Sequence, residues 1–561
     1  MSGAQAFFTQ SVPGCLCNGG QIARDDFDSS IPTTKYHRGS GRPELSDRNR
    51  ELYAALLIAG IAGVGAWTVL YATHPGIGVY SDSTYYLGVA RGLLAGRGYT
   101  ILDIHRNVDP VPLFPFVYPT LLALPGLFRV DLLAGARWVG AILFSANVLL
   151  IGAISYRRCS HSVGAAGLAA LLGCASFDML TYHAFVLSDA ACLTFALLAF
   201  LLIGNYFDKP SLGSFVGAAA ATALAFATRY AAAAFVFAGF AAILLWEKRA
   251  FAKRLLDAVL FGLGSSSLMI LWILRNMRYG HDATGRDLGF HPVMDMAQFK
   301  EILLAVSTWA SNGNLLTVDA YGRLPIVAGV ILVSLVAAAR ASRGKQGTDL
   351  RSALPLLYIL SYVVVLLLTS TFLQADLFLD SLRILLPLHV FIIILVVQMG
   401  SRLYQSLEPG VQKAAASALC IVISVCFLVW MNQWAHSTRE DGQGYASSTY
   451  TNSEMLRTIR SLPKDARIYS NLPWPIGIYT DRIWEQLPAK IDTATFGEDK
   501  EYRALMEDLA RTMHERDVYL AYFKEGDDWF DFPSVKDIQS FVPLRAVAET
   551  QDGTLYAAAG Q

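Results

Sequence analysis

The sequence predicts a mostly α-helical protein that crosses the membrane many times. Of its 561 residues, 54% are hydrophobic and only 16% are charged, whereas soluble globular proteins have about a quarter of their residues charged. Apolar stretches of the length that a helix needs to cross the hydrocarbon, about 20 residues, recur along the chain. The formal net charge is zero, so nothing indicates a nucleic-acid partner.

The apolar stretches predict about 11 membrane-spanning helices. A further apolar segment, 112–128, contains four prolines, and we expect it to be interfacial or re-entrant because proline interrupts a helix. The predicted spans are 52–72, 137–156, 163–181, 186–204, 213–229, 231–246, 255–274, 324–340, 353–371, 384–400 and 412–431.

Lysine and arginine occur in alternate connections between these stretches, which fixes the expected direction of insertion. The rule places the N-terminus inside and the C-terminal region outside the cytoplasm, in what we expect to be a bacterial inner membrane. Three long regions then face outward, 73–136, 275–323 and 432–561. The basic residues assigned to the inner side are Arg42, Arg48, Arg50, Arg157, Arg158, Lys209, Lys248, Arg249, Lys253, Arg254, Arg340, Arg343, Lys345, Arg351, Arg402 and Lys413.

Three domains are expected from this pattern. Residues 1–50 form a polar cytoplasmic tail, expected to be disordered, and residues 51–431 form the transmembrane domain. Residues 432–561 alternate helix-like runs with strand-like runs and are expected to form a small extracytoplasmic α/β domain. The helix-like runs are 453–462 and 498–515, and the strand-like runs are 468–470, 518–523 and 554–558.

The first outer loop contains a candidate functional carboxylate. From Ser83 to Ala95 the apolar and aromatic residues recur at helical spacing, which predicts an amphipathic helix on the outer membrane surface. Asp82 stands where this helix should begin, so it could cap the helix or take part in chemistry. The residue pattern leaves both interpretations open.

Further charged residues occur where the predicted spans meet the outer side. Asp189 lies at the mouth of the fourth span, where a carboxylate is costly unless it is paired or faces a wet cavity; a cap beside Ser188 is the alternative. Arg229, Arg275 and Arg383 each could extend to lipid headgroups, but together they could bind an anionic headgroup. Asp178, by contrast, is expected to be an ordinary loop residue.

Several short motifs follow one another along the chain between about residues 50 and 400. They are Tyr80-Ser-Asp82-Ser, Gly96-Arg-Gly-Tyr99, Pro112-Leu-Phe-Pro-Phe-Val-Tyr-Pro119, Val186-Leu-Ser-Asp189-Ala, Leu274-Arg-Asn276 with Gly280, and Leu382-Arg383 with Pro387. Their order resembles the GT-C superfamily of integral-membrane glycosyltransferases, in particular the bacterial branch related to protein O-mannosyltransferases and lipid A aminoarabinose transferases. One acid stands in the first loop where some relatives carry an Asp-Glu pair.

The resemblance implies transfer of a sugar from a polyprenyl-phosphate donor to a lipid, glycan or protein acceptor at the outer face, usually with inversion. Asp82 is then the base or the acid that organises the acceptor, and Asp189 is a second catalytic candidate. A divalent metal ion stays open as a cofactor. The expected donor-phosphate contacts are Arg383, Arg275 and Arg229, and the expected substrate contacts are Tyr80, Asn276 and Tyr230.

Two other functions stay open at this point. A lipid or solute transporter, or a flippase, would also be a polytopic helical protein, although transport needs polar groups on both sides of a midplane site. The charged candidates gather instead at the outer end, which favours the transferase. A binding or scaffolding role for residues 432–561 is the third possibility.

Overall fold

Long apolar helices make up the membrane part of the computed structural model, which describes residues 47–246, 249–279, 283–285, 306–309, 312, 350–372, 381–491, 499–526 and 531–560. In these ranges, seven helices are long and apolar enough to cross a membrane. The chain is therefore a multi-pass membrane protein, and the predicted span 324–340 lies outside the described residues. The seven helices are α1 (Asp47–Ala72), α4 (Leu132–Arg158), α7 (Asp189–Asp208), α10 (Phe251–Tyr279), α13 (Leu350–Phe372), α15 (Leu386–Ser406) and α16 (Val411–Asp441).

The predicted span 163–181 is a pair of helices rather than one straight helix. Helix α5 (Val163–Cys174) is followed by α6 (Phe177–His183), with a bend of 55° between them. Ser176 causes the break because its hydroxyl accepts a hydrogen bond from the backbone N–H of Met179 at 3.4 Å and so begins a new helix. The predicted spans 213–229 and 231–246 correspond to shorter apolar helices, α8 (Leu212–Phe226) and α9 (Ala233–Leu244), joined through the 3-10 turn η1 (Tyr230–Ala232).

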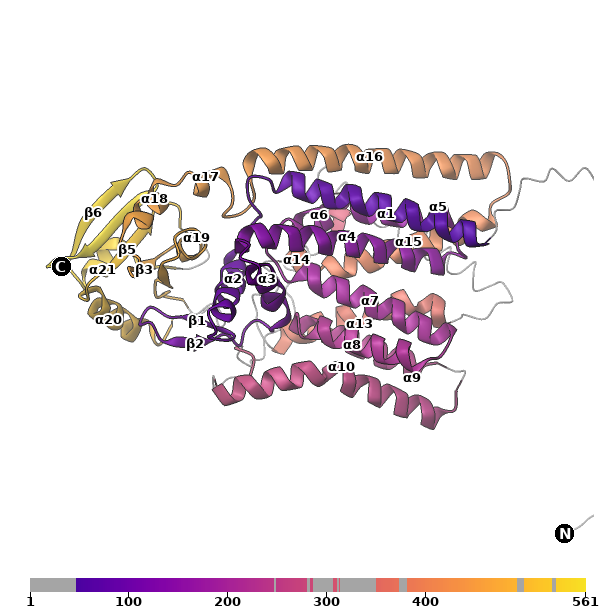
Figure 1. Cartoon of the computed structure of the whole chain (residues 1–561), viewed down its shortest axis with the longest axis horizontal. Coiled ribbons are helices and arrows are strands. Elements are labelled where there is room, and N and C mark those ends of the chain that lie inside the picture. Colours follow the sequence, from indigo (N-terminus) through magenta and orange to yellow (C-terminus); the bar gives the residue numbers. More distant parts are fainter. Residues whose placement is uncertain are drawn as a thin grey trace, which may run out of the picture. The chain divides into compact units, whose positions relative to one another are not determined.

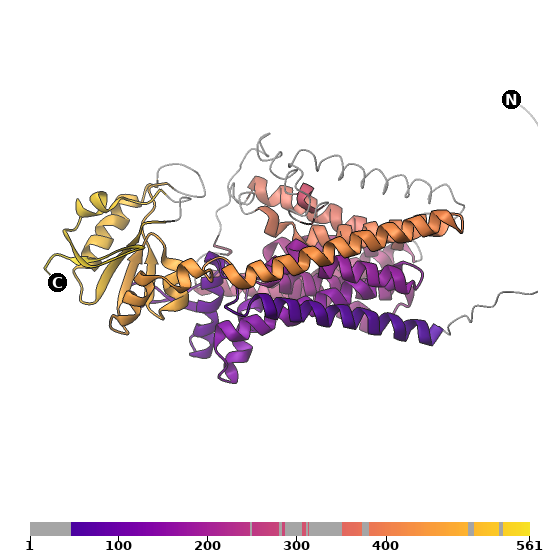
Figure 2. The same cartoon turned by 90° about the horizontal axis from the view of Figure 1, so that it is seen from above.

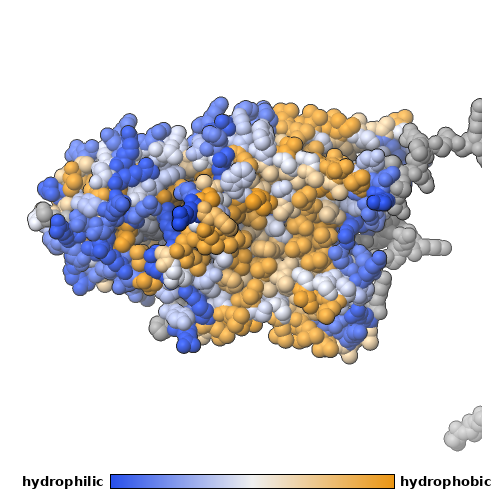
Figure 3. Space-filling view, viewed as in Figure 1, coloured by the Kyte–Doolittle hydropathy of each residue, from blue (hydrophilic) through white to orange (hydrophobic). Residues whose placement is uncertain are grey.

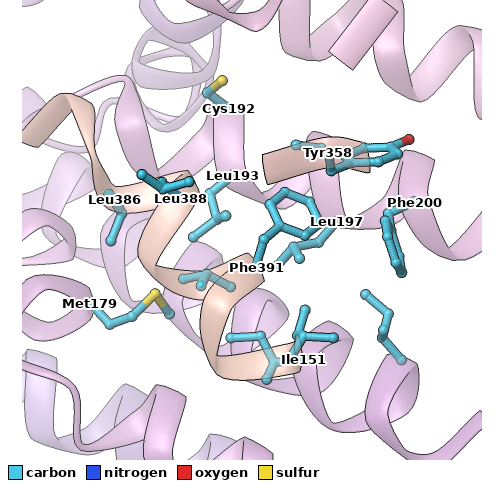
Figure 4. Packing of buried hydrophobic residues seen from close by; sticks show 14 of the residues in the cluster. Ile151, Met179, Cys192, Leu193, Leu197, Phe200, Tyr358, Leu386, Leu388 and Phe391 are labelled. Carbon is cyan, nitrogen blue, oxygen red and sulfur yellow. The ribbon is translucent and has the colours of Figure 1, made fainter. Parts of the chain in front are cut away.

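Neighbouring helices pack through their buried faces. Helix α1 packs against α4, α5 and α16, and α8 packs against α7 and α10 (Figures 1 and 2). In the interior, Phe391 of α15 lies beside Tyr358 of α13, with ring centroids 5.1 Å apart, and Tyr358 also meets Phe200 of α7 at 4.9 Å (Figure 4). The outer surface over these helices is broadly hydrophobic (Figure 3), as contact with lipid requires.

The segment between α1 and α4 folds into two short helices and a hairpin. Helix α2 (Ser81–Leu94) confirms the predicted amphipathic helix, with one face buried. Strands β1 (Thr100–Leu102) and β2 (Val108–Pro110) pair antiparallel. Helix α3 (Val117–Leu127) has 11 residues, too few to cross the hydrocarbon, which agrees with the expectation that 112–128 does not span.

The C-terminal region is a small α/β domain, as predicted. Its sheet has the order β4-β3-β5-β7-β6, in which β3 is parallel to β4 and β5, and β7 is antiparallel to β5 and β6. The strands are β3 (Arg467–Ser470), β4 (Ile483–Gln486), β5 (Val518–Phe523), β6 (Leu544–Thr550) and β7 (Gly553–Ala558), and the helices are α17 (Ser448–Thr451), α18 (Glu454–Ser461), α19 (Pro473–Tyr479), α20 (Tyr502–Met513) and α21 (Val535–Gln539).

Candidate active site

The segments before α2 and α7 are joined by backbone hydrogen bonds, which bring the starts of the two helices together. The N–H of Gly78 donates to the carbonyl of Ala184 at 2.8 Å, and the N–H of Val186 donates to the carbonyl of Gly78 at 2.9 Å. A side chain at Gly78 would come within 2.6 Å of the Phe185 ring, so only glycine fits this close approach. This pairing is what sets Asp82 of α2 near Asp189 of α7.

Hydroxyl groups reinforce the same junction. The hydroxyl of Ser83 accepts from the N–H of Tyr80 at 2.8 Å and donates to the carbonyl of Val186 at 2.9 Å. One turn later, the hydroxyls of Tyr86 and Ser188 lie 2.9 Å apart. The polar atoms at the two helix starts are thus held by partners on the other helix or its approach.

Two aspartates and two arginines meet at this junction and form what we call the four-charge cluster: Asp82, Asp189, Arg229 and Arg383. Arg383 lies on the short helix α14 (Ser381–Ile384) that precedes α15. Its Nη2 lies 2.5 Å from Asp82 Oδ2, and its Nε lies 3.3 Å from Asp189 Oδ2. Arg229, in the break between α8 and η1, places Nη1 2.8 Å from Asp189 Oδ2 and 3.1 Å from Ser188 Oγ. Arg383 therefore bridges both carboxylates.

The four-charge cluster is largely withdrawn from solvent. The side chains of Arg383, Asp82 and Asp189 are 16%, 23% and 2% exposed. Burial by itself lowers the pKa of Arg383, but the negative charges of Asp82 and Asp189 outweigh it and raise that pKa well above its usual value. Both arginines point at carboxylates, so neither extends to a headgroup in this structure.

The helix-cap interpretations of the two aspartates do not hold. Helix α2 begins at Ser81 with Tyr80 as its N-cap, so Asp82 is the second helical residue. Asp189 is the first residue of α7, whose N-cap is Ser188. Both carboxylates are instead bonded to arginines, a contact between distant parts of the chain that local sequence spacing does not reveal.

Arg275 and its neighbours form a second group, whose partners differ from those of the four-charge cluster. Arg275 donates to the carbonyl of Tyr99 at 3.2 Å and lies over the ring of Trp272, 5.0 Å from its centroid. In the part of the chain that the structure describes, no carboxylate pairs with Arg275. Asn276 is fully buried and donates to the carbonyl of Ala283 at 3.2 Å.

Tyr230 connects the two groups. It follows Arg229 in the chain, its hydroxyl donates to the carbonyl of Pro112 at 2.8 Å, and it accepts from Nε1 of Trp272 at 3.2 Å. The proline-rich stretch therefore rests on the break that carries Arg229. The ring of Tyr80 stacks on that of Phe185 with centroids 4.5 Å apart. Tyr80 is 44% exposed.

Asp178 is not the ordinary loop residue that the sequence suggests. It lies in the first turn of α6, is only 1% exposed, and bonds His389 Nδ1 at 2.9 Å. The ring of Trp309 stacks on His389 with centroids 4.7 Å apart. The contact ties α6 to the first turn of α15, directly after the helix that carries Arg383. Residues 211 positions apart meet here, so no local motif could have indicated the pair.

Glu485 is a second site residue that sequence reasoning missed. It lies on β4, close to the hairpin formed by β1 and β2. Burial, together with the nearby charges of Asp103 and Asp109, raises the pKa of Glu485 from 4.5 to about 7. The titratable or charged groups that act on Glu485, or on which it acts, are Asp103, His105 and Asp109 of the hairpin, Tyr85 of α2 and Tyr469 of β3.

This raised pKa predicts a pH-dependent loss of stability. Well below pH 4.5 the carboxyl is neutral in both the folded and the unfolded chain. Between about pH 4.5 and 7 the unfolded chain releases the proton that the folded chain keeps, so the free energy of unfolding falls over this window and stays lowered above it. We therefore expect Glu485→Gln to raise the melting temperature of the purified protein at pH 8 and to leave it unchanged at pH 4.5. The matched control is Glu507→Gln, an exposed glutamate on α20. An equal effect of Glu485→Gln at both pH values would contradict the prediction.

Among the residues that the structure describes, no group of three or more histidine, cysteine, aspartate or glutamate side chains is placed to hold a metal ion.

Comparisons with known proteins find similarity of structure without similarity of sequence. No family model matches the chain, and no curated protein matches it. ArnT from Cupriavidus metallidurans, solved bound to undecaprenyl phosphate, superposes with a TM-score of 0.58 at 12% identity, over 89% of this chain and 97% of that one.

Two further solved structures share the arrangement. The arabinofuranosyltransferase AftD from Mycobacteria gives a TM-score of 0.52 at 14% identity, over 92% of this chain and 40% of AftD. The archaeal oligosaccharyltransferase AglB from Archaeoglobus fulgidus, in complex with an inhibitory peptide and a dolichol-phosphate, gives 0.52 at 10% identity, over 84% and 70%. The chain therefore shares its overall fold with these three solved structures over 84–92% of its length.

Proposed function

We propose that this chain is a glycosyltransferase that moves a sugar from a polyprenyl-phosphate donor to an acceptor at the extracytoplasmic face of a bacterial inner membrane. The four-charge cluster is the observation that carries the proposal. It joins a partly exposed carboxylate, Asp82, to a guanidinium, Arg383, at the start of an amphipathic helix. The lipid phosphates bound by ArnT and AglB support a lipid-phosphate ligand for the same fold.

The proposed transfer reaction uses the carboxylate of Asp82 as a base and the guanidinium of Arg383 as a partner for the phosphate. Asp82 accepts the proton of the acceptor hydroxyl while that oxygen bonds to the anomeric carbon, and the bond from this carbon to the phosphate oxygen breaks. The electron pair leaves with the polyprenyl phosphate, whose added charge Arg383 stabilises. Attack from the side opposite the phosphate inverts the anomeric centre. Asp189 acts by holding Arg383 and Arg229 in place, since it contacts both.

Arg383 must change partners during such a reaction. In the structure it is bonded to Asp82 Oδ2 at 2.5 Å, so a carboxylate oxygen that would take the acceptor proton is occupied by the guanidinium. A donor phosphate that attracts Arg383 releases Asp82 for proton transfer. Donor binding thus prepares the base, so the proposed order is donor first and acceptor second.

The remaining candidates are assigned to substrate contact. Arg275, which no described carboxylate neutralises, is proposed to meet the phosphate, and Arg229 supports Arg383 from the other side of Asp189. Tyr80 offers an exposed ring beside Asp82, suited to covering a sugar. Asn276 is proposed to hold the segment at Ala283, whose carbonyl it bonds. Tyr230 is proposed to hold the proline-rich stretch against the break between α8 and η1 by its bond to the carbonyl of Pro112.

The test is donor consumption by the purified protein in lipid nanodiscs. We expect polyprenyl phosphate to be released from an undecaprenyl-phosphate hexose or pentose when membranes that lack this protein are supplied as a source of acceptor. Mass spectrometry of the membranes identifies the sugar-bearing product. Recovery of intact donor that has moved between leaflets of proteoliposomes would instead assign the chain to the transporter alternative.

A further inference from the structure

Two arginines from different helices converge on the last turn of α1. Arg137 of α4 donates from Nε to the hydroxyl of Thr73 at 3.1 Å and from Nη2 to the carbonyl of Leu70. Arg439 of α16 donates from Nη1 to the carbonyl of Tyr71 at 3.2 Å. Because the two carbonyls belong to adjacent residues, both guanidinium groups lie beside the same turn.

This turn lies at one end of three spanning helices. Helix α1 packs against α4 and α16, and the last turn of α1, the second turn of α4 and the last turn of α16 all lie toward α2 and the C-terminal domain (Figures 1 and 2). Along α16 the surface is hydrophilic next to α17 and turns hydrophobic beyond it (Figure 3). The two arginines therefore lie at the level where lipid headgroups meet the ends of spanning helices.

Aromatic rings border the same turn. The guanidinium of Arg439 lies over the ring of Tyr71, 4.4 Å from its centroid, and this ring stacks on that of Trp67 at 5.2 Å. Trp67 is 63% exposed, and Trp138, which follows Arg137, is 56% exposed. Accessible tryptophan and tyrosine rings at the ends of spanning helices are typical of the boundary between membrane and water. The rings thus agree with a position at headgroup level.

Accessible apolar side chains continue from this turn toward the middle of the helices. Val64 of α1 is 52% exposed, and Val425 and Val429 of α16 are 53% and 50% exposed. Only 11% of the most apolar part of α16 is buried inside the protein. A ligand held by the arginines would therefore have apolar surface beside it that acyl chains can cover.

The positive charge at this turn is not neutralised by a carboxylate in the part of the chain that the structure describes. Glu440 and Asp441 follow Arg439 and are exposed, and Asp441 accepts from the hydroxyl of Ser437 at 3.2 Å. An arginine has five N–H donors, and the contacts above use two of Arg137 and one of Arg439. Both guanidinium groups therefore keep donors for an anion.

We propose that Arg137 and Arg439 bind the phosphate of an anionic phospholipid, whose acyl chains lie along α1 and α16. The guanidinium fork matches phosphate oxygens, and two such groups at one turn favour a lipid with net negative charge. Phosphatidylglycerol has that charge, whereas phosphatidylcholine brings a cation of its own toward the arginines. The site shares no residue with the four-charge cluster and does not depend on the proposed function.

Lipid selectivity tests the site directly. The purified protein is titrated with phosphatidylglycerol and with phosphatidylcholine of the same chains, and native mass spectrometry counts the bound lipids. We expect phosphatidylglycerol to bind at least about tenfold more tightly, which corresponds to about 1.4 kcal/mol. Equal affinities would overturn the proposal. Displacement of phosphatidylglycerol by inorganic phosphate at equal concentration would also overturn it, because the site would then bind a free anion.

Variants then locate the lipid. Arg137→Gln and Arg439→Gln each keep a side-chain N–H donor but lose the charge, and each is expected to weaken phosphatidylglycerol binding about tenfold. The matched control is Arg129→Gln, an exposed arginine between α3 and α4, which should change the affinity by less than about twofold. An equal loss in the control would indicate long-range charge rather than a site. Unchanged affinity in both test variants, with a lower melting temperature, would leave the arginines as caps of α1 and overturn the site.

Undecaprenyl phosphate separates this site from the proposed donor site. Arg137→Gln should keep the affinity for undecaprenyl phosphate within about twofold, and Arg383→Ala should keep that for phosphatidylglycerol within about twofold, since distant sites act independently. Loss of both affinities in Arg137→Gln would merge the two sites and overturn this proposal. Selective phosphatidylglycerol binding in a protein that consumes no donor would retain the lipid site and remove the transferase.

Discussion

Asp82→Asn is expected to fold normally and to transfer sugar at least about a hundredfold more slowly than the parent, because general-base catalysis is worth about that much. The amide keeps the size of the carboxylate and still accepts a hydrogen bond from Arg383, but it cannot take a proton from the acceptor. Since Asp82 is not the N-cap of α2, the helix should lose little stability. The measurement is kcat with a polyprenyl-phosphate sugar, alongside the melting temperature.

Asp131→Asn is the matched control for this variant. Asp131 is the N-cap of α4 and accepts from the N–H of Ala134 at 3.0 Å. Asparagine caps a helix about as well as aspartate, so the control should keep both stability and rate. A rate near that of the parent for Asp82→Asn would remove the catalytic assignment and leave Asp82 as a structural partner of Arg383.

The sequence predicts the membrane part and the location of the charged residues well, because both depend on local information. Apolar stretches of spanning length predict the long helices, and the periodicity after Asp82 predicts α2. Strands β5 and β7 have the apolar, β-branched and aromatic composition that favours strands. Strand β4 (Ile483–Gln486) has only four residues and lies at the edge of the sheet, so the local sequence is too short to predict it. Its packing comes from β3 and α19.

The partners within the site could not be predicted, since they depend on contacts between distant positions. Arg383 and Asp82 are 301 residues apart, and each alone is compatible with a surface role. The sequence groups Arg275 with Arg383 but does not indicate the partner that the structure gives Arg275, the carbonyl of Tyr99. Glu485 carried no signal at all in the sequence, since its pKa arises from burial against a hairpin about 380 residues earlier in the chain.

Arg383→Ala is expected to lower the affinity for undecaprenyl phosphate about tenfold to a hundredfold, since a hydrogen bond to a charged group is worth about 1.5–3 kcal/mol. Arg383→Lys should give a smaller loss, because lysine keeps the charge without the two-pronged donor geometry. The lipid phosphate is titrated against each variant in nanodiscs. Because the ligand is the leaving group without its sugar, the result does not depend on the acceptor.

Arg249→Ala is the control for Arg383→Ala, because it shows what the loss of a partly buried arginine does to stability by itself. Arg249 pairs with Asp257 at 2.7 Å and is 23% exposed. It lies just before the first turn of α10, whereas Arg275 lies near the last turn of the same helix. A purely structural role predicts that Arg249→Ala and Arg383→Ala lower the melting temperature alike and leave lipid-phosphate affinity unchanged. The affinity for the lipid phosphate therefore distinguishes a phosphate-binding Arg383 from a purely structural one, whereas the melting temperature does not.

The bond between Arg383 and Asp82 leads to a further prediction about lipid-phosphate affinity, which the same variants test. If the phosphate and Asp82 compete for Arg383, Asp82→Asn should bind undecaprenyl phosphate more tightly than the parent, because the competing carboxylate is gone. Combining Asp82→Asn with Arg383→Ala should abolish that gain, since the arginine that benefits is absent. Parental affinity in Arg383→Ala would place the phosphate elsewhere, with Arg229 as the next candidate. A gain in Asp82→Asn that persists without Arg383 would show that the carboxylate repels the phosphate directly.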